Sequence, residues 1–373
     1  MILFEHGPDG AALLFEQPEQ VIVAWEPEDV PGAFAAMARA QAAGRWLAGY
    51  GSYELGYVLE PRLAGLLPGG RRVPLMLFGV FAAGADGTAM LARAGREPGG
   101  LSVPVPGWSA QTYGAAFDQV AAYIAAGDCY QVNLTMAMTA QASGTALGLF
   151  GALRRRQPVR HGAFVDLGVG PVILSRSPEL FFRLGADGTI ETRPMKGTAP
   201  RDRDPARDAA LKAALRASLK DRAENLMIVD LLRNDLSRLC APGSVRVPEL
   251  YRVETYETLH QMVSRVVGRL RPGVELAALF AALFPCGSIT GAPKIRAMEI
   301  IRDLEPAPRG VYCGAIGWIA PDGAAEFNVA IRTLSLFDGG RVELNVGGGV
   351  VHDSTAVAEY EEALWKARFA DLS

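Results

Sequence analysis

The sequence predicts an α+β fold. Expected strands and expected helices follow one another in runs along the 373 residues, which disfavours the strict strand–helix alternation of a doubly wound parallel sheet. Half of the residues are hydrophobic, and a chain of this length buries a sizeable core. Gly and Pro (42 and 24 residues) separate many short apolar runs, as is typical of strands joined by turns.

The first part of the chain is expected to hold strands and one helix. Residues 31–43 have the apolar spacing of a helix, which Gly44 would end. Short apolar runs with strand composition occur at 13–17, at 21–25, from Trp46 onward and at 73–83.

The composition shifts to Gly, Pro and Ala between Gly84 and Ser109. Such a stretch is typical of a connector. The chain is therefore divided into an N-terminal segment, residues 1–108, and a larger segment, residues 109–373.

The larger segment is expected to alternate groups of helices and strands. Its longest helical region, 204–238, is rich in Ala, Leu, Lys and Arg, and Asp202 or Asp204 would cap it. Further helices are expected at 113–126, 274–283, 292–304 and 355–371, and strands at 130–140, 161–167, around SPELFF, and at 244–270, 311–319, 326–337 and 341–346.

Charge and cysteine content exclude several classes of protein. With 37 Lys+Arg against 40 Asp+Glu, the chain lacks the basic excess of a nucleic-acid binder. No apolar run approaches the ~20 residues of a membrane span, and MILFEHGPDG does not resemble a secretory signal. Four cysteines without a CxxC pair indicate reduced thiols. We expect a cytoplasmic protein without nucleic-acid or membrane partners.

Two pairs of carboxylates stand three residues apart on expected helices. Asp221 and Glu224 form one pair, and Glu359 and Glu362 form the other. This spacing places both members of a pair on one helix face. Two such faces turned toward each other would suit Mg²⁺, which prefers a few carboxylates with substrate oxygens and water. The alternative is that they are solvated surfaces paired with neighbouring cations.

Three elements are candidates for binding an anion. GSITGAPK (287–294) places the hydroxyls of Ser288 and Thr290 before a helix, whose start offers free N–H groups. Gly347–Gly349 would let a backbone approach a ligand closely. Arg332 is the one cation in an apolar strand, where it needs an anionic partner. The alternatives are an ordinary helix start, a plain turn and an edge-strand arginine.

Lys196, Glu179 and His260 are candidates for acid–base or nucleophilic chemistry. A lysine in a partly dry site loses its proton and becomes a nucleophile, and Lys196 lies between Pro and Gly in TRPMKGT. Glu179 in SPELFF precedes an apolar run that would raise its pKa. A solvated lysine, a surface glutamate and a satisfied core histidine are the alternatives.

These pieces together resemble the chorismate-utilising enzymes, the group that contains the large components of anthranilate synthase and aminodeoxychorismate synthase. The resemblance runs from about Tyr113 to the C-terminus, and GSYELGY (51–57) is similar to the family's SYE stretch. The motifs occur in the family's order: YIAAGDCYQVNL, SPELF, TRPMKGTAPR, AENLMIVDLLRNDL, LHQMVS, GSITGAPK, RGVYCGAIG, AIRTL, GGGVVHDS and EYEEALWKA.

The resemblance implies an anthranilate synthase component I-like fold, with two large antiparallel sheets packed face to face and helices outside. Residues 1–108 would be the N-terminal segment of that type, and 109–373 the catalytic domain. The resemblance also implies a Mg²⁺ cofactor bridging to the substrate's ring carboxylate. Glu224 and Glu362 match its ligands, and Asp221 and Glu359 would support them.

The resemblance further assigns roles around the substrate, chorismate. Glu179 matches the general acid that assists loss of the C4 hydroxyl. Tyr312 and Arg332 match the residues that hold the enolpyruvyl carboxylate. The rest of the implied pocket consists of Thr198, Lys366 and the backbone of Gly347, Gly348 and Gly349, with His260 and Thr290 beside the ring and its departing hydroxyl.

Two positions discriminate among members of the family. Relatives that add water carry a lysine base where this chain has Gln131, which disfavours isochorismate formation. Anthranilate synthases usually carry Ala at the position of Lys196, whereas aminodeoxychorismate synthases have PIKGT, close to PMKGT here. The resemblance thus implies a transaminase-class amination of chorismate at C4 through a covalent Lys196 adduct.

The implied product is 4-amino-4-deoxychorismate, a precursor of 4-aminobenzoate and folate. No glutaminase signature is evident in the sequence, so ammonia is expected from a separate glutamine amidotransferase subunit or from free ammonia. Anthranilate formation for tryptophan synthesis is the first alternative. A chorismate-binding subunit without catalysis is the second.

Overall fold

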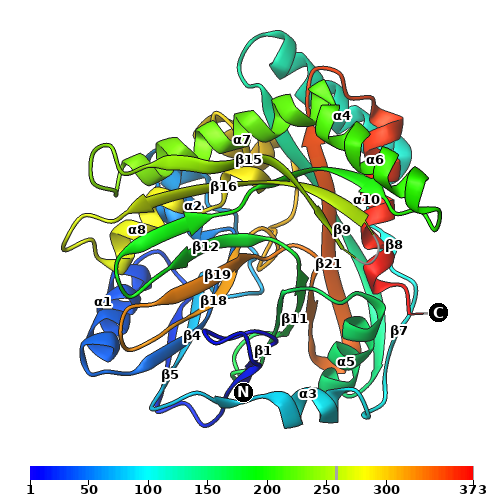
Figure 1. Cartoon of the computed structure of the whole chain (residues 1–373). Coiled ribbons are helices and arrows are strands. Elements are labelled where there is room, and N and C mark those ends of the chain that lie inside the picture. The colour runs from blue at the N-terminus through cyan, green and yellow to red at the C-terminus, as the bar shows by residue number, and fades with distance from the viewer. Residues whose placement is uncertain (257–258, 373) are drawn as a thin grey trace.

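Two antiparallel sheets with helices outside them form the molecule, which confirms the α+β fold (Figure 1). The computed structural model describes residues 1–256 and 259–372. In the described chain, the 11-stranded sheet has the order β17 (Gly291–Ala292), β9 (Gln131–Gly144), β21 (Arg341–Val350), β20 (Thr333–Leu336), β11 (Val172–Ser177), β10 (His161–Val165), β1 (Ile2–Phe4), β2 (Leu13–Phe15) and β6 (Ala85–Asp86), with β7 (Gly99–Leu101) and β8 (Val105–Pro106) paired to β9.

The second sheet has ten strands within the same described ranges. Its order is β14 (Met195–Pro200), β16 (Leu259–Arg269), β13 (Thr189–Thr192), β12 (Leu180–Leu184), β19 (Ala325–Val329), β18 (Ala315–Ile319), β4 (Trp46–Gly51), β5 (Met76–Phe81) and β3 (Gln20–Ala24), with β15 (Arg246–Thr255) paired to β16. In Figure 1 the long strands β9 and β21 stand upright, whereas β12, β15 and β16 run across the view.

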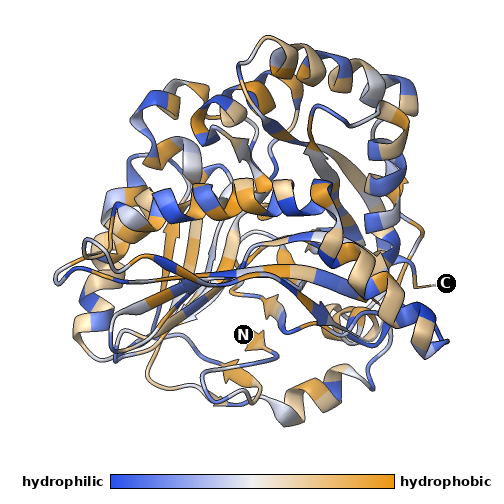
Figure 2. Ribbon diagram, turned by 45° about the horizontal axis from the view of Figure 1, so that its top comes forward, coloured by the Kyte–Doolittle hydropathy of each residue, from blue (hydrophilic) through white to orange (hydrophobic). Residues whose placement is uncertain are grey.

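Helices cover the outer surfaces of the sheets. Figure 1 shows α7 above β15 and β16, and α10 beside β9 and β21. Along the helices of Figure 2, hydrophobic and hydrophilic residues alternate, as expected where one face packs on a sheet. The helices are α1 (Asp29–Ala42), α2 (Leu55–Leu59), α3 (Thr88–Ala94), α4 (Ala110–Ala125), α5 (Ala146–Arg156), α6 (Pro205–Ala217), α7 (Leu219–Ser237), α8 (Leu276–Leu283), α9 (Lys294–Leu304) and α10 (Ala356–Lys366), with 3₁₀ turns at Pro61–Leu66, Gly287–Ile289, Asp338–Gly340 and Ala367–Ala370.

A continuous apolar core joins the two sheets. It contains Leu134 of β9, Phe182 of β12 and Phe280 of α8, all fully buried. Phe182 stacks on Phe327 of β19 with ring centroids 5.1 Å apart. Burial of such aromatic side chains is the main favourable contribution to stability, and it fixes the strands that carry the polar groups described below.

The N-terminal segment supplies strands to both sheets. β1, β2 and β6 join the first sheet, and β3, β4 and β5 join the second. Glu5 forms a 2.7 Å ion pair with the fully buried Arg176 of β11. Glu54 accepts hydrogen bonds from the backbone N–H groups of Arg309 and Gly310 at 2.7 and 3.0 Å. Residues 1–108 therefore pack into the same core as the rest of the chain.

Several local predictions differ from the structure. The stretch 84–109 is more than a connector, because it contains α3 and three short strands. The single helical region at 204–238 is two helices separated at Ser218, whose hydroxyl accepts a hydrogen bond from the Asp221 N–H at 3.2 Å and caps α7. α5 had no counterpart in the prediction.

The expected strand at 326–337 is interrupted at Arg332. β19 before it and β20 after it belong to different sheets. Arg332 has a φ of 51°, a left-handed conformation that non-glycine residues rarely adopt. The chain therefore turns at Arg332 as it crosses between sheets, and Arg332 is at a strand end instead of within a strand.

Among the described residues, no helix combines the length and the apolar character needed to cross a membrane.

Candidate active site

Lys196 lies in a bulge of strand β14. The pairing of β14 with β16 shifts between Met195 and Thr198, so Lys196 and Gly197 interrupt the ladder. Gly197 has a φ of 86°, and a Cβ there would lie 2.8 Å from the Cβ of Asp221. Both the left-handed backbone and the close approach of α7 require glycine at this position. The bulge thus gives the Lys196 side chain a direction that a regular strand would not.

The charges around Lys196 come from three separate parts of the chain: α7, α10 and the turn that carries Glu179. Burial, followed by the ammonium of Lys366, lowers the pKa of Lys196, while the carboxylates of Glu224, Glu179 and Glu362 oppose this shift. The net lowering increases the fraction of neutral amine, the form that acts as a nucleophile. The structure therefore brings this lysine together with the predicted acid and with members of both carboxylate pairs.

Glu179 is a buried carboxyl group between β11 and β12, only 5% exposed. Burial raises its pKa to about 7, against the hydrogen bond from Ser288 and the charges of Lys196 and Arg332. The Ser288 hydroxyl donates that bond at 2.8 Å to Glu179 Oε1. A carboxyl group with this pKa is partly protonated near neutrality, as a general acid requires.

Arg332 presents a half-buried guanidinium at the turn between β19 and β20. Within the described residues, the guanidinium has no hydrogen bond or ion pair. Burial lowers the pKa of Arg332, and the charge of Glu179 partly offsets this. A half-buried guanidinium without a partner in the protein is available to bind a carboxylate through two parallel hydrogen bonds.

The two carboxylate pairs lie on α7 and α10, as the spacing predicted. Burial is the main cause of the raised pKa of Glu224, to which the charges of Asp221 and Glu359 add. The charge of Glu359 also acts on Glu224, so acidic side chains of the two helices are within electrostatic range of each other. Burial also raises the pKa of Glu359, which accepts a 2.6 Å hydrogen bond from Ser354.

The second carboxylate of α10 is tied to strand β21 through Lys366. Lys366 Nζ lies 2.7 Å from Glu362 and donates to the carbonyl oxygen of Gly347 at 2.9 Å. Burial raises and the Lys366 ammonium lowers the pKa of Glu362, and the net direction is downward. A Cβ at Gly348 would lie 2.9 Å from Glu359 Oε2, so glycine there lets the helix approach the strand.

The acidic residues fit a divalent cation that takes part of its ligands from a substrate. Across residues 1–256 and 259–372, no group of three or more His, Cys, Asp or Glu side chains is close enough to hold a metal by itself. Mg²⁺ commonly binds through one or two carboxylates with substrate oxygens and water. The oxygen-only donors of α7 and α10 agree with that chemistry.

Three further residues of the predicted site are Gln131, Thr290 and Tyr312. Gln131 is 1% exposed, and its Nε2 has no hydrogen-bond partner among the described residues. A Cβ added at Gly349 would lie 3.0 Å from this nitrogen. The Thr290 hydroxyl donates to carbonyl oxygens in its own loop, at 3.2 and 3.3 Å. Burial raises the pKa of Tyr312 above its ordinary value. The Nε2 of Gln131 is therefore a buried donor that is open to a ligand.

His260 and Gln261 are adjacent on β16 and point in different directions. His260 Nε2 lies 2.9 Å from Asp208 Oδ1, and Nδ1 lies 3.1 Å from Thr255 Oγ1. Gln261 instead contacts Gly197 and Thr198, next to Lys196. Side chains of successive strand residues face opposite sides. The role of His260 beside the ring stays a prediction, and Gln261 is a neighbour of Lys196 that the sequence analysis missed.

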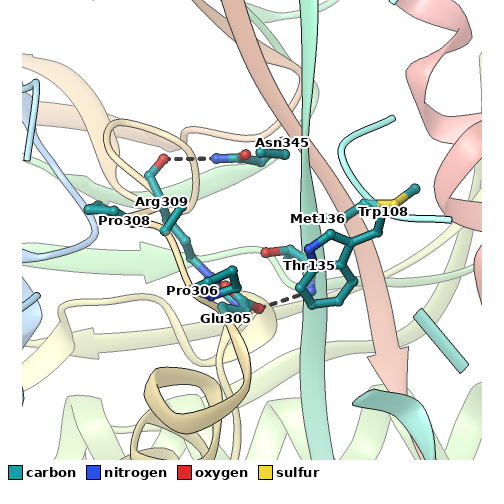
Figure 3. A pocket seen from close by; sticks show the side chains of 10 residues that line it. Trp108, Thr135, Met136, Glu305, Pro306, Pro308, Arg309 and Asn345 are labelled. Atoms are coloured by element: carbon teal, nitrogen blue, oxygen red, sulfur yellow. Dashed lines mark hydrogen bonds and ion pairs between the residues drawn. The ribbon is translucent and has the colours of Figure 1, made fainter. Parts of the chain in front are cut away.

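A cavity of about 40 Å³ lies elsewhere, between β9, β21 and the loop after α9 (Figure 3). Within it the Thr135 N–H donates to Glu305 at 2.9 Å and the Asn345 amide donates to the Arg309 carbonyl oxygen at 3.0 Å. The volume suffices for a water molecule but is far below the ~300 Å³ of typical ligand pockets. Its lining residues do not include Lys196 or the residues described around it, so the cavity is separate from the candidate site.

Comparisons with known proteins agree with the motifs. The profile of the family described as chorismate binding enzyme matches residues 92–371. Aminodeoxychorismate synthase component 1 of Klebsiella aerogenes is 49% identical over 258 residues, which are 69% of this chain and 56% of that protein. Anthranilate synthase component 1 of Streptomyces coelicolor is 43% identical over 267 residues, 70% of this chain and 52% of that protein.

The fold agrees as well. The crystal structure of anthranilate synthase component I from Streptococcus pneumoniae TIGR4 has a TM-score of 0.80 at 25% identity and covers 95% of this chain and 91% of its own. The alignments span little more than half the length of the two curated relatives named above. The family profile nevertheless covers most of the chain, and the resemblance inferred from the motifs is confirmed. The chain belongs to the chorismate binding enzyme family.

Proposed function

We propose that this protein aminates chorismate at C4, in the manner of aminodeoxychorismate synthase component 1, the name of the Klebsiella relative. The observation that carries the proposal is Lys196, a lysine of lowered pKa surrounded by the charges of Glu179, Glu224 and Glu362. A nucleophile beside a general acid and a pair of metal-binding carboxylates is the set of groups that this substitution needs.

The substrate binds through its two carboxylates. Arg332 holds the enolpyruvyl carboxylate together with Tyr312. The Arg332 guanidinium has no hydrogen bond or ion pair within the described ranges. Glu224 and Glu362, supported by Asp221 and Glu359, would hold Mg²⁺, which would supply positive charge for the ring carboxylate. The backbone of Gly347–Gly349 and the side chains of Thr198 and Lys366 border the ring.

The reaction consists of two substitutions. The neutral amine of Lys196 forms a bond to C2, the ring double bonds shift, and the C4–O bond breaks. Glu179 gives its proton to the departing hydroxyl, which leaves as water. Ammonia then forms a bond to C4, the double bonds shift back, and the bond between C2 and Lys196 breaks. The net change is chorismate plus ammonia to 4-amino-4-deoxychorismate plus water.

Ammonia comes from a separate glutamine amidotransferase subunit. A glutaminase nucleophile of the cysteine type needs an accessible thiol of low pKa. The four cysteines, Cys129, Cys240, Cys286 and Cys313, are buried and free, and burial raises the pKa of each thiol. The product is a precursor of 4-aminobenzoate and supports folate synthesis in the cytoplasm.

Anthranilate synthesis is the second candidate. It is favoured by the Streptomyces coelicolor relative and by the structure from Streptococcus pneumoniae, both of which are named anthranilate synthases. Lys196 argues against it, since anthranilate synthases resemble this chain but usually carry alanine at that position.

Product identity distinguishes the two candidates. The purified protein is incubated with chorismate, Mg²⁺ and ammonium, and the products are separated and identified by mass spectrometry. We expect 4-amino-4-deoxychorismate, which becomes 4-aminobenzoate only after an aminodeoxychorismate lyase is added. Formation of anthranilate in the absence of the lyase would overturn the proposal.

A further inference from the structure

The side-chain amide of Gln261 is bonded at both ends to the two residues that follow Lys196. Its Nε2 donates to the carbonyl oxygen of Gly197 at 2.7 Å. Its Oε1 accepts from the hydroxyl of Thr198 at 3.1 Å. The amide therefore uses both its donor and its acceptor on one short segment of β14.

That segment is where the backbone ladder of β14 is interrupted. The pairing with β16 joins Met195 to Val263 and resumes only at Thr198 and Gln261. The two bulged residues between them have lost regular ladder partners, and the left-handed backbone of Gly197 makes the segment adaptable. The Gln261 side chain supplies a hydrogen bond to the bulge that the backbone does not.

Gln261 is itself held on a rigid strand. β16 is paired on one side with β14 and on the other with β15, where Glu254 is the partner of Gln261. Strand residues with neighbours on both sides are more precise platforms than loop residues. The position of Gln261 is therefore set by the sheet and transmitted to the bulge.

The opposite side of the bulge is also fixed. A Cβ added at Gly197 would lie 2.8 Å from the Cβ of Asp221 and 2.9 Å from its Oδ1. Asp221 is on α7, one helical turn before Glu224. The bulge is thus held between the amide of Gln261 and the carboxylate face of α7, and its position sets how Lys196 lies relative to Glu224 and Glu179.

We propose that Gln261 is a positioning residue for Lys196, whose amide holds the bulge so that the lysine amine meets the reacting carbon of the substrate. The inference rests on the proposed role of Lys196 as nucleophile. A displacement of about 1 Å at a reacting atom lowers a rate roughly 10²-fold. Gln261 contacts the carbonyl oxygen of Gly197 and the hydroxyl of Thr198, and it acts on Lys196 through these two residues.

The amide chemistry at this position is specific. Gln261→Met keeps the length of the side chain and removes both hydrogen bonds. Gln261→Glu cannot donate to the Gly197 carbonyl oxygen and adds a negative charge, which favours the ammonium form of Lys196. Gln261→Asn keeps the amide but is one methylene shorter. The three variants therefore distinguish the effects of the two hydrogen bonds, of an added charge and of side-chain length.

Gln141 offers a matched control. It also lies on a strand, β9, and its Nε2 donates to a glycine carbonyl oxygen, that of Gly339, at 2.8 Å. The bond is on the exposed surface. Gln141→Met removes an equivalent hydrogen bond and is expected to leave turnover within about twofold of the wild type.

The experiment measures steady-state kinetics with chorismate, Mg²⁺ and ammonium. We expect Gln261→Met to lower kcat about 10²-fold while KM for chorismate changes less than about threefold. In Gln261→Glu, the limb of the pH profile that rises with deprotonation of Lys196 should move to higher pH. Melting temperatures of all variants are recorded, and if Gln261→Met does not fold, Gln261→Asn takes its place with the same expected loss.

The outcomes separate this inference from the proposed function. If Lys196→Ala abolishes turnover but the Gln261 variants retain wild-type kcat, Gln261 does not position the lysine. The inference is also overturned if the Gln261 variants lose turnover only in proportion to their loss of folded protein. Full turnover by Lys196→Ala would instead overturn the proposed function itself.

Discussion

The hydroxyl of Ser288 donates a 2.8 Å hydrogen bond to the buried carboxyl group of Glu179. Burial raises the pKa of Glu179 to about 7, and this hydrogen bond is the largest influence in the opposite direction. Ser288 therefore adjusts the pH range over which Glu179 remains protonated. If Glu179 is the general acid, as proposed, kcat/KM should fall as the pH rises through its pKa.

Ser288→Ala should move that falling limb to higher pH by about one to two units. The variant removes a hydrogen bond that favours the ionised carboxylate, and a hydrogen bond to a charged group contributes about 1.5–3 kcal/mol. The pH dependence of kcat/KM for chorismate checks this. An alkaline limb that stays in place, or moves to lower pH, would contradict the role assigned to Ser288.

Glu179→Gln should lower kcat by about 10²–10⁴-fold, the usual contribution of a general acid. The amide cannot give a proton to the departing hydroxyl, but it retains an oxygen that accepts from Ser288. The alkaline limb of the pH profile should disappear in the residual activity. A variant that keeps this limb would show that another group provides the proton.

Glu179→Gln should also be more stable than the wild type at pH 8 and equally stable near pH 4. The folded-state pKa of about 7 lies above the ordinary value of 4.5, so the buried carboxyl favours folding below pH 4.5 and this contribution is lost as the pH rises through 7. The difference at pH 8 should be about 3 kcal/mol.

Urea unfolding of both proteins at the two pH values tests this. Glu54 is also buried, with its pKa raised by burial to about 7, but it is present in both proteins and its effect cancels. Equal stability at pH 8 would mean that other interactions in the folded state offset the cost of burying the ionised Glu179 carboxylate.

The sequence predicted the parts of the site that depend on local geometry. The spacing of Glu224 from Asp221 and of Glu362 from Glu359 is a property of a single helix, and both helices formed where expected. The α+β class also followed from the order of elements. The arrangement of two antiparallel sheets came from the family resemblance, because pairing between distant strands leaves no local signal.

Contacts between distant segments were missed for the same reason. The pattern LHQMVS indicates that His260 and Gln261 face opposite sides of a strand, but not which side holds Lys196. Arg332 was expected inside a strand because its apolar neighbours continue on both sides, whereas the chain changes sheets there. Residues 84–109 were expected to be a connector because short strands and the seven-residue α3 give weak patterns among Gly and Pro.

Glu362→Gln should raise the Mg²⁺ concentration for half-maximal turnover at least tenfold, since it removes one proposed ligand charge. Glu361→Gln is the matched control, because Glu361 is exposed on the same helix and has no proposed role. Calorimetric titration of Mg²⁺ in the presence of chorismate gives a readout independent of turnover. Equal Mg²⁺ affinities for the two variants would exclude Glu362 as a ligand.

The covalent role of Lys196 is the central claim, and the mass of the Lys196 peptide tests it most directly. The protein is mixed with chorismate and Mg²⁺ without ammonia, quenched in acid, digested and analysed by mass spectrometry. The account predicts a Lys196 peptide heavier by one chorismate less one water, which disappears when ammonium is added. A peptide that stays unmodified, together with wild-type turnover by Lys196→Ala, would contradict it.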